Sequence, residues 1–268
     1  MDVIGVVPAA GKGVRLNLPF SKELFPLPDG NNHKKITPVI NYLLNGMKIA
    51  GIKRVFTIIS KEKKDLLQYL GSGNDFDLQI IYLLQDNARG MPEAISLVTN
   101  WINYNTVVLF GMPDTIFFPI DAMRIILDEL LNSQADLVLG LFPTDTPNYF
   151  GVVDFDDNYR PIDFIDKPTH TELKFVWGIG CWKFRFMEIL NSFVQQYKEY
   201  NKELILSDIF KIALSQKLDI RVHPFYNGEY YDIGITSEIP NVIKRLSNQV
   251  DTSSHNQLNN NTNELLSK

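Results

Sequence analysis

The chain has 268 residues, of which 45% are hydrophobic and 21% charged, so it can form one large α/β core or two modest domains. Its formal net charge of −5 and isoelectric point near 5.4 argue against nucleic acid or an anionic membrane as the main partner, because both attract basic surfaces. A single cysteine, Cys181, excludes a disulfide within the chain, and the four histidines lack the spacing of a zinc site.

The N-terminus lacks a basic segment followed by a long apolar stretch, and no apolar run approaches the roughly 18 residues of a membrane span. We therefore expect a cytoplasmic protein that does not enter a membrane.

A loop of small residues follows the first expected strand, at residues 3–7. Its backbone amides can face an anion, and Arg15 and Lys22 add positive charge beside it. Leu16 stands where a dinucleotide fingerprint needs glycine, and the spacing of the two glycines does not fit a Walker loop. The pattern favours a polyphosphate-binding loop, and an ordinary tight turn with surface charges is the alternative. The small residues are Ala9, Ala10, Gly11 and Gly13.

Strands and helices alternate over the first half of the chain. Apolar runs without strict alternation predict strands covered on both faces; they lie at 3–7, 55–59, 78–84, 106–110 and 137–142. Helical periodicity predicts helices over 40–47 and 120–131, and Pro92 suits the first turn of another helix. This order predicts an α/β fold with a doubly wound, mostly parallel, Rossmann-like sheet.

The pattern of predicted elements changes after Pro143. Residues 150–155, 162–165 and 176–184 predict strands with fewer helices between them. We expect a smaller β-rich lobe over about 143–247, joined to a nucleotide-binding part over about 1–142 in one domain of residues 1–247. Residues 248–268 are rich in Asn, Ser and Thr, which predicts a flexible tail.

Three loops should meet at one rim of this sheet, because ligands of open α/β sheets bind beyond the carboxyl ends of the strands. The first loop carries Arg15 and Lys22, the second carries Gln85, and the third carries Asp114. An amide, cations and a carboxylate in one place suggest base recognition, phosphate binding and a magnesium ligand. Asp114 as a cap and Gln85 as a surface residue are the alternatives.

Six motifs, in this order and spacing, resemble the sugar-phosphate nucleotidyltransferase family, most closely its thymidylyltransferases, over about residues 3–237. The motifs are the loop from Gly11 to Arg15 with Lys22 to Pro26, Gln85 to Gly90, Asp114, Phe150 to Val153, Asp166 to Pro168, and Tyr231 to Gly234.

The resemblance implies that the phosphate of a sugar 1-phosphate attacks the α-phosphorus of a nucleoside triphosphate and that pyrophosphate leaves, with dTTP and glucose 1-phosphate favoured. It implies catalytic cations at Arg15, Lys22 and Lys167, and Mg²⁺ held by Asp114 and Asp232. It also implies nucleotide contacts from Ala9, Ala10, Gly11, Gly13, Gln85 and Gly90, and sugar contacts from Gly151, Asp166 and Gly180.

The chain also departs from the family pattern. Ala10 and Val14 stand where glycine and threonine are usual, the loop from Arg15 to Lys22 is short as in certain cytidylyltransferases, and Asp166 replaces a glutamate. A cytidylyl- or uridylyltransferase acting on another sugar or alditol phosphate therefore stays open. A non-catalytic nucleotide-sugar-binding regulatory protein on the same fold also stays open, as does a homo-oligomer. A glycosyltransferase would normally show two acids flanking one residue where this chain has Asp114 alone.

Overall fold

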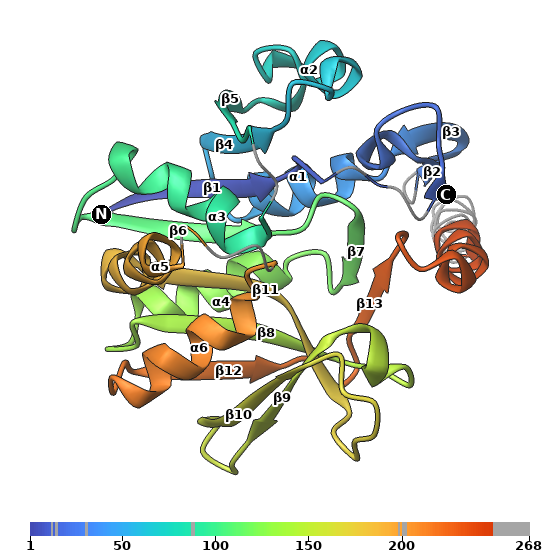
Figure 1. The fold of residues 1–268 in the computed structure, drawn as a ribbon. Helices are drawn as coiled ribbons and strands as arrows, with labels where there is room; N and C mark the ends of the chain where they lie inside the picture. The colour runs from blue at the N-terminus through green and yellow to red at the C-terminus, as the bar shows by residue number, and fades with distance from the viewer. Residues whose placement is uncertain are drawn as a thin grey trace, which may run out of the picture.

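The computed structural model in Figure 1 describes residues 1–11, 13, 16–29, 32–86, 89–197, 199 and 203–248. Its strands are β1 (Asp2–Pro8), β2 (Pro26–Asp29), β3 (Asn32–Pro38), β4 (Arg54–Ile59), β5 (Gln79–Leu84), β6 (Thr106–Gly111), β7 (Thr115–Phe118), β8 (Leu137–Pro143), β9 (Gly151–Phe155), β10 (Pro161–Asp166), β11 (Phe175–Lys183), β12 (Ile220–Pro224) and β13 (Glu229–Asp232).

The helices alternate with these strands along most of the chain. The α-helices are α1 (Ile40–Ile49), α2 (Lys64–Leu70), α3 (Met91–Ser96), α4 (Ala122–Leu131), α5 (Phe184–Gln196) and α6 (Leu206–Ser215), and residues 239–248 are also helical. The short 3-10 helices are η2 (Lys22–Leu24), η3 (Asn74–Phe76), η4 (Leu97–Trp101), η5 (Pro147–Tyr149) and η6 (Thr236–Glu238).

One mixed sheet forms the centre of the molecule, in the order β10-β9-β11-β6-β1-β4-β5, with β8 and then β12 joined to β11. β1, β4, β5 and β6 pair in parallel, whereas β11 runs antiparallel to β6 and β8. Strands from both halves of the sequence thus share one sheet. The expected α/β, Rossmann-like fold is confirmed, and the expected strands at 3–7, 55–59, 78–84, 106–110 and 137–142 coincide with β1, β4, β5, β6 and β8.

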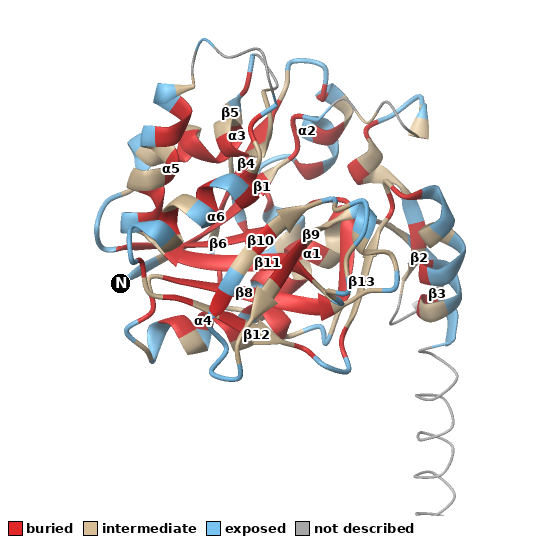
Figure 2. Ribbon diagram, turned by 60° about the horizontal axis from the view of Figure 1, so that its bottom comes forward, coloured by how far each residue is buried: buried red, intermediate tan, exposed pale blue. Residues whose placement is uncertain are grey.

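Helices cover both faces of the sheet, as the apolar strands predict (Figure 2). On β6, Val108 and Phe110 face the core that contains α3, α5 and α6, whereas Val107 and Leu109 face the core that contains α1, α2 and α4. This alternation follows from the pleat of a strand, which points successive side chains to opposite faces. Burying both sets of side chains fixes the register of the strand, and with it the direction of the loops at its end.

A two-stranded antiparallel sheet of β7 and β13 lies beside the carboxyl end of β6 (Figure 1). It brings a segment near residue 230 against a segment near residue 116, although more than a hundred residues separate them in the sequence. β2 and β3 form a separate hairpin that follows η2.

Two further features of the fold concern the single cysteine and the lengths of the helices. Cys181 is fully buried, and burial holds the pKa of its thiol well above the ordinary value, so the thiol stays protonated. In the part of the chain that the structure describes, no helix has both the length and the apolar character needed to cross a membrane.

Candidate active site

Lys22, Asp114 and Asp232 come together at the carboxyl end of the parallel strands. The Lys22 ammonium donates a hydrogen bond to Oδ2 of Asp114 and forms an ion pair with it. A Cβ atom placed on Gly234 would lie 2.9 Å from Oδ1 of Asp232 and 3.8 Å from Oδ2 of Asp114. Both carboxylates therefore border the same small space. The side chain of Asp114 is 9% exposed, so it is held largely away from bulk water.

The pairing of β13 with β7 places the second carboxylate. Asp232 lies opposite Thr115, the residue that follows Asp114. The Ile233 N–H donates to the carbonyl oxygen of Asp114 at 3.1 Å, and the Gly234 N–H donates to Oδ1 of Asp232 at 2.7 Å. The backbone thus fixes both aspartates before any ligand binds.

The charge balance of this cluster is visible in the pKa of Lys22. Burial alone would lower that pKa, but the ion pair with Asp114 and the charge of Asp232 raise it above the ordinary value of 10.5. Lys22 is therefore a cation at neutral pH. In such a cluster the ammonium can bind phosphate oxygens, and the two carboxylates can bind a divalent ion.

The segment that carries Lys22 is tied to the start of α2 by two separate links. The Ser21 N–H and hydroxyl each donate to Asp65, at 2.6 Å to Oδ2 and Oδ1. Lys63 Nζ donates to Oε2 of Glu23 at 2.6 Å, and both of these side chains are buried. Breaking a buried ion pair from one side is costly, so these links fix the position of η2 strongly.

The small-residue loop after β1 is described in part. Ala9 and Ala10 are buried, and the Ala9 N–H donates to the Ile58 carbonyl at 2.7 Å. Gly13 has a φ of 63°, a backbone conformation that favours glycine, and its Cβ position lies 3.5 Å from the Lys22 side chain. Gly13 therefore lies beside Lys22, whereas among the described residues no atom beyond the chain neighbours of Gly11 lies within 4 Å of its Cβ position. Arg15 lies outside the described residues.

Gln85 and Gly90 form a second part of the rim. Gln85 is 6% exposed, and its Nε2 donates to Oε2 of Glu93 at 2.9 Å. Gly90 has a φ of 109°, and a Cβ there would lie 2.3 Å from the carbonyl oxygen of Leu204, so no larger residue fits without a shift of backbone. The close approach of the Leu204 backbone and the positive φ of residue 90 both explain why this position is a glycine.

Gly151, Asp166 and Lys167 lie together on the β9–β10 hairpin. Gly151 pairs with Asp166, and the Lys167 N–H donates to the Phe150 carbonyl at 2.8 Å. Lys167 has a φ of 44°, an uncommon conformation for a residue with a side chain. Such outliers concentrate at functional sites, where the surrounding structure holds them.

Gly180 is separated from this hairpin. It lies inside the sheet, paired with Phe110 and Leu139, and the side chains of Leu139 and Trp182 come within 2.9 and 3.2 Å of its Cβ position. The structure therefore groups Lys22 with the two aspartates, and Gly151 with Asp166 and Lys167, but encloses Gly180 in core packing.

The sequence patterns missed polar atoms beside Gly151. A Cβ there would lie 2.3 Å from Nε1 of Trp177 and 3.2 Å from Oγ of Ser207. Both atoms are buried and lack a hydrogen-bond partner among the described residues. Trp177 lies in the apolar strand β11, and an apolar run in the sequence gives no sign that one of its side chains offers a hydrogen-bond donor.

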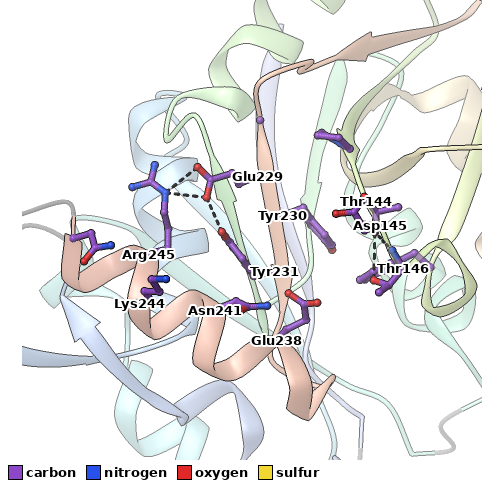
Figure 3. Close-up of a pocket in the computed structure, with 14 residues that line it drawn as sticks. Thr144, Asp145, Thr146, Glu229, Tyr230, Tyr231, Glu238, Asn241, Lys244 and Arg245 are labelled. Atoms are coloured by element: carbon purple, nitrogen blue, oxygen red, sulfur yellow. Dashed lines mark hydrogen bonds and ion pairs between the residues drawn. The ribbon is translucent and has the colours of Figure 1, made fainter.

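A pocket of about 480 Å³ lies between β13, residues 143–150 and the helix at 239–248 (Figure 3). Arg245 joins two parts of the pocket wall. Its Nε donates to both carboxylate oxygens of Glu229 at 2.8 Å, and its guanidinium lies 4.4 Å from the centre of the Phe118 ring. Tyr230 points to one side of β13 and Tyr231 to the other. None of the residues predicted to bind substrate lines this pocket.

Within the described residues, no group of three or more His, Cys, Asp or Glu side chains is arranged to hold a metal ion. Asp114 and Asp232 form a pair of carboxylates instead. A pair of this kind suits Mg²⁺, which commonly binds one or two protein carboxylates and takes its other ligands from water and substrate phosphates.

Comparisons with known proteins identify the family to which the chain belongs. Glucose-1-phosphate thymidylyltransferase of Neisseria gonorrhoeae is 27% identical over 215 residues, which cover 78% of this chain and 70% of that protein. A Bacillus subtilis protein assigned as a UTP–glucose-1-phosphate uridylyltransferase is 25% identical over 265 residues, covering 87% and 92%.

Among solved structures, a Bacillus anthracis protein assigned as a glucose-1-phosphate thymidylyltransferase, crystallised with sucrose, superposes with a TM-score of 0.76. The match covers 91% of this chain and 95% of that one at 22% identity, and it supports the fold alone. The family model described as Nucleotidyl transferase matches residues 4–249. The chain therefore belongs to the nucleotidyl transferase family.

Proposed function

We propose that this protein transfers a nucleotidyl group from a nucleoside triphosphate to a sugar 1-phosphate and releases pyrophosphate, with dTTP and glucose 1-phosphate as the favoured pair. The observation that carries the proposal is the meeting of Lys22, Asp114 and Asp232 at the rim where ligands of such sheets bind. Relatives named for thymidylyl and uridylyl transfer to glucose 1-phosphate support both the reaction and the sugar.

The reaction is an in-line displacement. A phosphate oxygen of the sugar 1-phosphate forms a bond to the α-phosphorus of the nucleoside triphosphate. The bond from the α-phosphorus to the oxygen that links it to the β-phosphorus breaks. The pyrophosphate leaves with the bonding electrons. Because the sugar phosphate is itself the attacking group, the protein forms no covalent intermediate. Catalysis of this kind depends on positioning and on charge stabilisation.

The residues of this chain then have separate tasks. Lys22 holds triphosphate oxygens, and Arg15 holds the departing pyrophosphate. Lys167 binds the sugar phosphate, whose repulsion from the triphosphate must be overcome. Asp166 and the backbone of Gly151 contact sugar hydroxyls, and Gln85 with the backbone of Gly90 reads the base.

Asp114 and Asp232 are the residues that would hold Mg²⁺. When bound, the ion neutralises charge that builds on the phosphate oxygens around the α-phosphorus. A pair of carboxylates suits an ion that would take its other ligands from water and from substrate phosphates.

The test is a pyrophosphate-release assay over a grid of nucleoside triphosphates and sugar 1-phosphates, run with Mg²⁺ and with excess EDTA. We expect the highest kcat/KM for dTTP with glucose 1-phosphate and loss of activity in EDTA. A higher kcat/KM for CTP or UTP, or for another sugar or alditol phosphate, would replace the favoured pair. Nucleotide binding without turnover of any pair would identify a regulatory binding protein instead.

A further inference from the structure

Glu93 is the centre of a hydrogen-bond network that no motif of the sequence indicated. One of its carboxylate oxygens, Oε2, accepts from Nε2 of Gln85 at 2.9 Å and from the backbone N–H of Arg89 at 3.0 Å. The other oxygen, Oε1, accepts from Nε and Nη2 of Arg89 at 2.8 and 2.7 Å. Both oxygens of Glu93 are thus engaged, and its carboxylate cannot rotate freely.

This network determines which way the amide of Gln85 faces. An ionised carboxylate accepts hydrogen bonds and donates none, so only the NH₂ group of Gln85 can face Glu93. Burial alone would raise the pKa of Glu93, but the hydrogen bonds from Arg89 and Gln85 hold it below the ordinary value of 4.5, and Glu93 stays ionised at neutral pH. Flipping the amide would place the Gln85 carbonyl against a carboxylate.

A fixed amide can distinguish the pyrimidine bases. Thymine and uracil present an N3–H donor next to a carbonyl acceptor at position 4, whereas cytosine presents an N3 acceptor next to an amino donor. A freely flipping glutamine pairs with either pattern, because its oxygen and NH₂ group exchange places. A glutamine held in one orientation pairs well with one pattern only.

We propose that Glu93 is a positioning residue for nucleotide choice: it fixes the amide of Gln85 so that the site discriminates between cytosine and the thymine or uracil class. The proposal rests on the proposed function in one respect, because it takes Gln85 as the residue that reads the base. Arg89 supports Glu93 from the other side and keeps its carboxylate in place.

The experiment measures dissociation constants for dTTP, UTP, CTP and inorganic triphosphate by calorimetry with Mg²⁺, so no sugar phosphate is needed. In Glu93→Gln, the new amide can donate or accept, and both orientations of Gln85 become available. We expect the ratio of dissociation constants between CTP and dTTP to move toward one by about tenfold or more. The constant for inorganic triphosphate should change by less than about threefold, because that ligand has no base.

Three further variants make the result decisive. Arg89→Met leaves the carboxylate of Glu93 intact but loosens it, so the same ratio should shift in the same direction by a smaller factor. Glu188→Gln alters a glutamate on α5 that accepts a hydrogen bond from Tyr104 on the surface, and its ratio should match the wild type. Gln85→Ala should remove the discrimination altogether. Thermal unfolding checks that each variant is folded.

The outcomes separate this proposal from the proposed function. A ratio that is unchanged in Glu93→Gln and in Arg89→Met, but lost in Gln85→Ala, overturns the role of Glu93 and leaves Gln85 as the reader. A ratio unchanged in all three variants overturns the proposal and the assignment of Gln85 together. Failure of the wild type to bind any of the three nucleotides counts against the proposed function itself.

Discussion

At the scale of single residues, the balance between one cation and two carboxylates dominates the candidate active site. Lys22 bonds directly to Asp114, and the charge of Asp232 adds to the attraction. Without the Lys22 ammonium, the buried carboxylate of Asp114 would be left unpaired, and an unpaired buried charge is expensive. Bound phosphates and a divalent ion can exchange partners with this cluster without leaving any charge unpaired.

Asp114→Asn tests this balance. The substitution keeps the size of the side chain but removes the negative charge, so we expect kcat to fall about a hundredfold or more, as for other lost charge stabilisation in a transition state. Steady-state kinetics with saturating Mg²⁺ measures the effect. Asp77→Asn is the matched control, because Asp77 is exposed and pairs with Lys48 on the surface. Turnover near that of the wild type in Asp114→Asn would remove Asp114 from the mechanism.

At the scale of elements, the start of α2 positions the loop that carries Lys22. Asp65 accepts from the N–H and hydroxyl of Ser21, and Lys63 pairs with the buried Glu23. These contacts join residues about forty positions apart, so a helix with no predicted functional residue helps to hold the site. The position of Lys22 then depends on the packing of α2 against the sheet.

The pKa of Asp65 predicts how this link responds to pH. Burial would raise that pKa, but the hydrogen bonds from Ser21 and the backbone lower it below the ordinary value of 3.8. A carboxylate with a lowered pKa in the folded state stabilises the protein fully above the pKa of the unfolded chain, and this contribution is lost as the pH falls through the lower value.

We therefore expect Asp65→Asn to lower the free energy of unfolding by about 1 kcal/mol at pH 7, in keeping with hydrogen bonds to a charged group at a partly exposed site. The difference from the wild type should shrink as the pH falls below about 4. Urea unfolding between pH 3 and pH 7 measures it, with the exposed Asp75→Asn as control. A difference that stays constant over this range would show that the charge of Asp65 is not what matters.

The sequence predicted the elements that carry their own signal. Apolar runs located β1, β4, β5, β6 and β8, and strand-end loops then placed Gln85 and Asp114 at one rim. α5 was missed although Phe186, Met187 and Leu190 lie on its buried face at helical spacing, so that signal was available. β13 gives no such signal, because it has four residues, all partly buried, and pairs with β7 only through the tertiary fold.

At the scale of the whole molecule, the candidate site is a product of long-range assembly. Lys22 comes from the segment after β1, Asp114 from the end of β6 and Asp232 from β13 near the end of the described chain. Family resemblance could name Asp232 as a metal ligand, but its place beside Asp114 follows only from the register of β13 on β7. Glu93 was missed for a related reason, because its role depends on which side chains the fold places around it.

This assembly predicts that a nucleotide stabilises the whole fold and that Asp232 contributes to the effect. A ligand that binds only the folded protein adds about 2.7 kcal/mol at a hundred times its dissociation constant. We expect Mg²⁺ with dTTP to raise the midpoint of thermal unfolding of the wild type. In Asp232→Asn the rise should be much smaller at the same concentrations, since one carboxylate of the pair is lost.

Asn at position 232 can still accept the Gly234 N–H through its side-chain oxygen, so the turn after β13 should persist and the unliganded protein should unfold at nearly the wild-type temperature. Asp156→Asn is the matched control, because Asp156 also accepts backbone N–H groups in a turn, at 2.9 Å from Asn158 and Arg160, but lies on the β9–β10 turn away from Asp114. If Mg²⁺ with dTTP raised the midpoint of thermal unfolding equally in Asp232→Asn and in the control, Asp232 would lie beside the site without taking part in ligand binding.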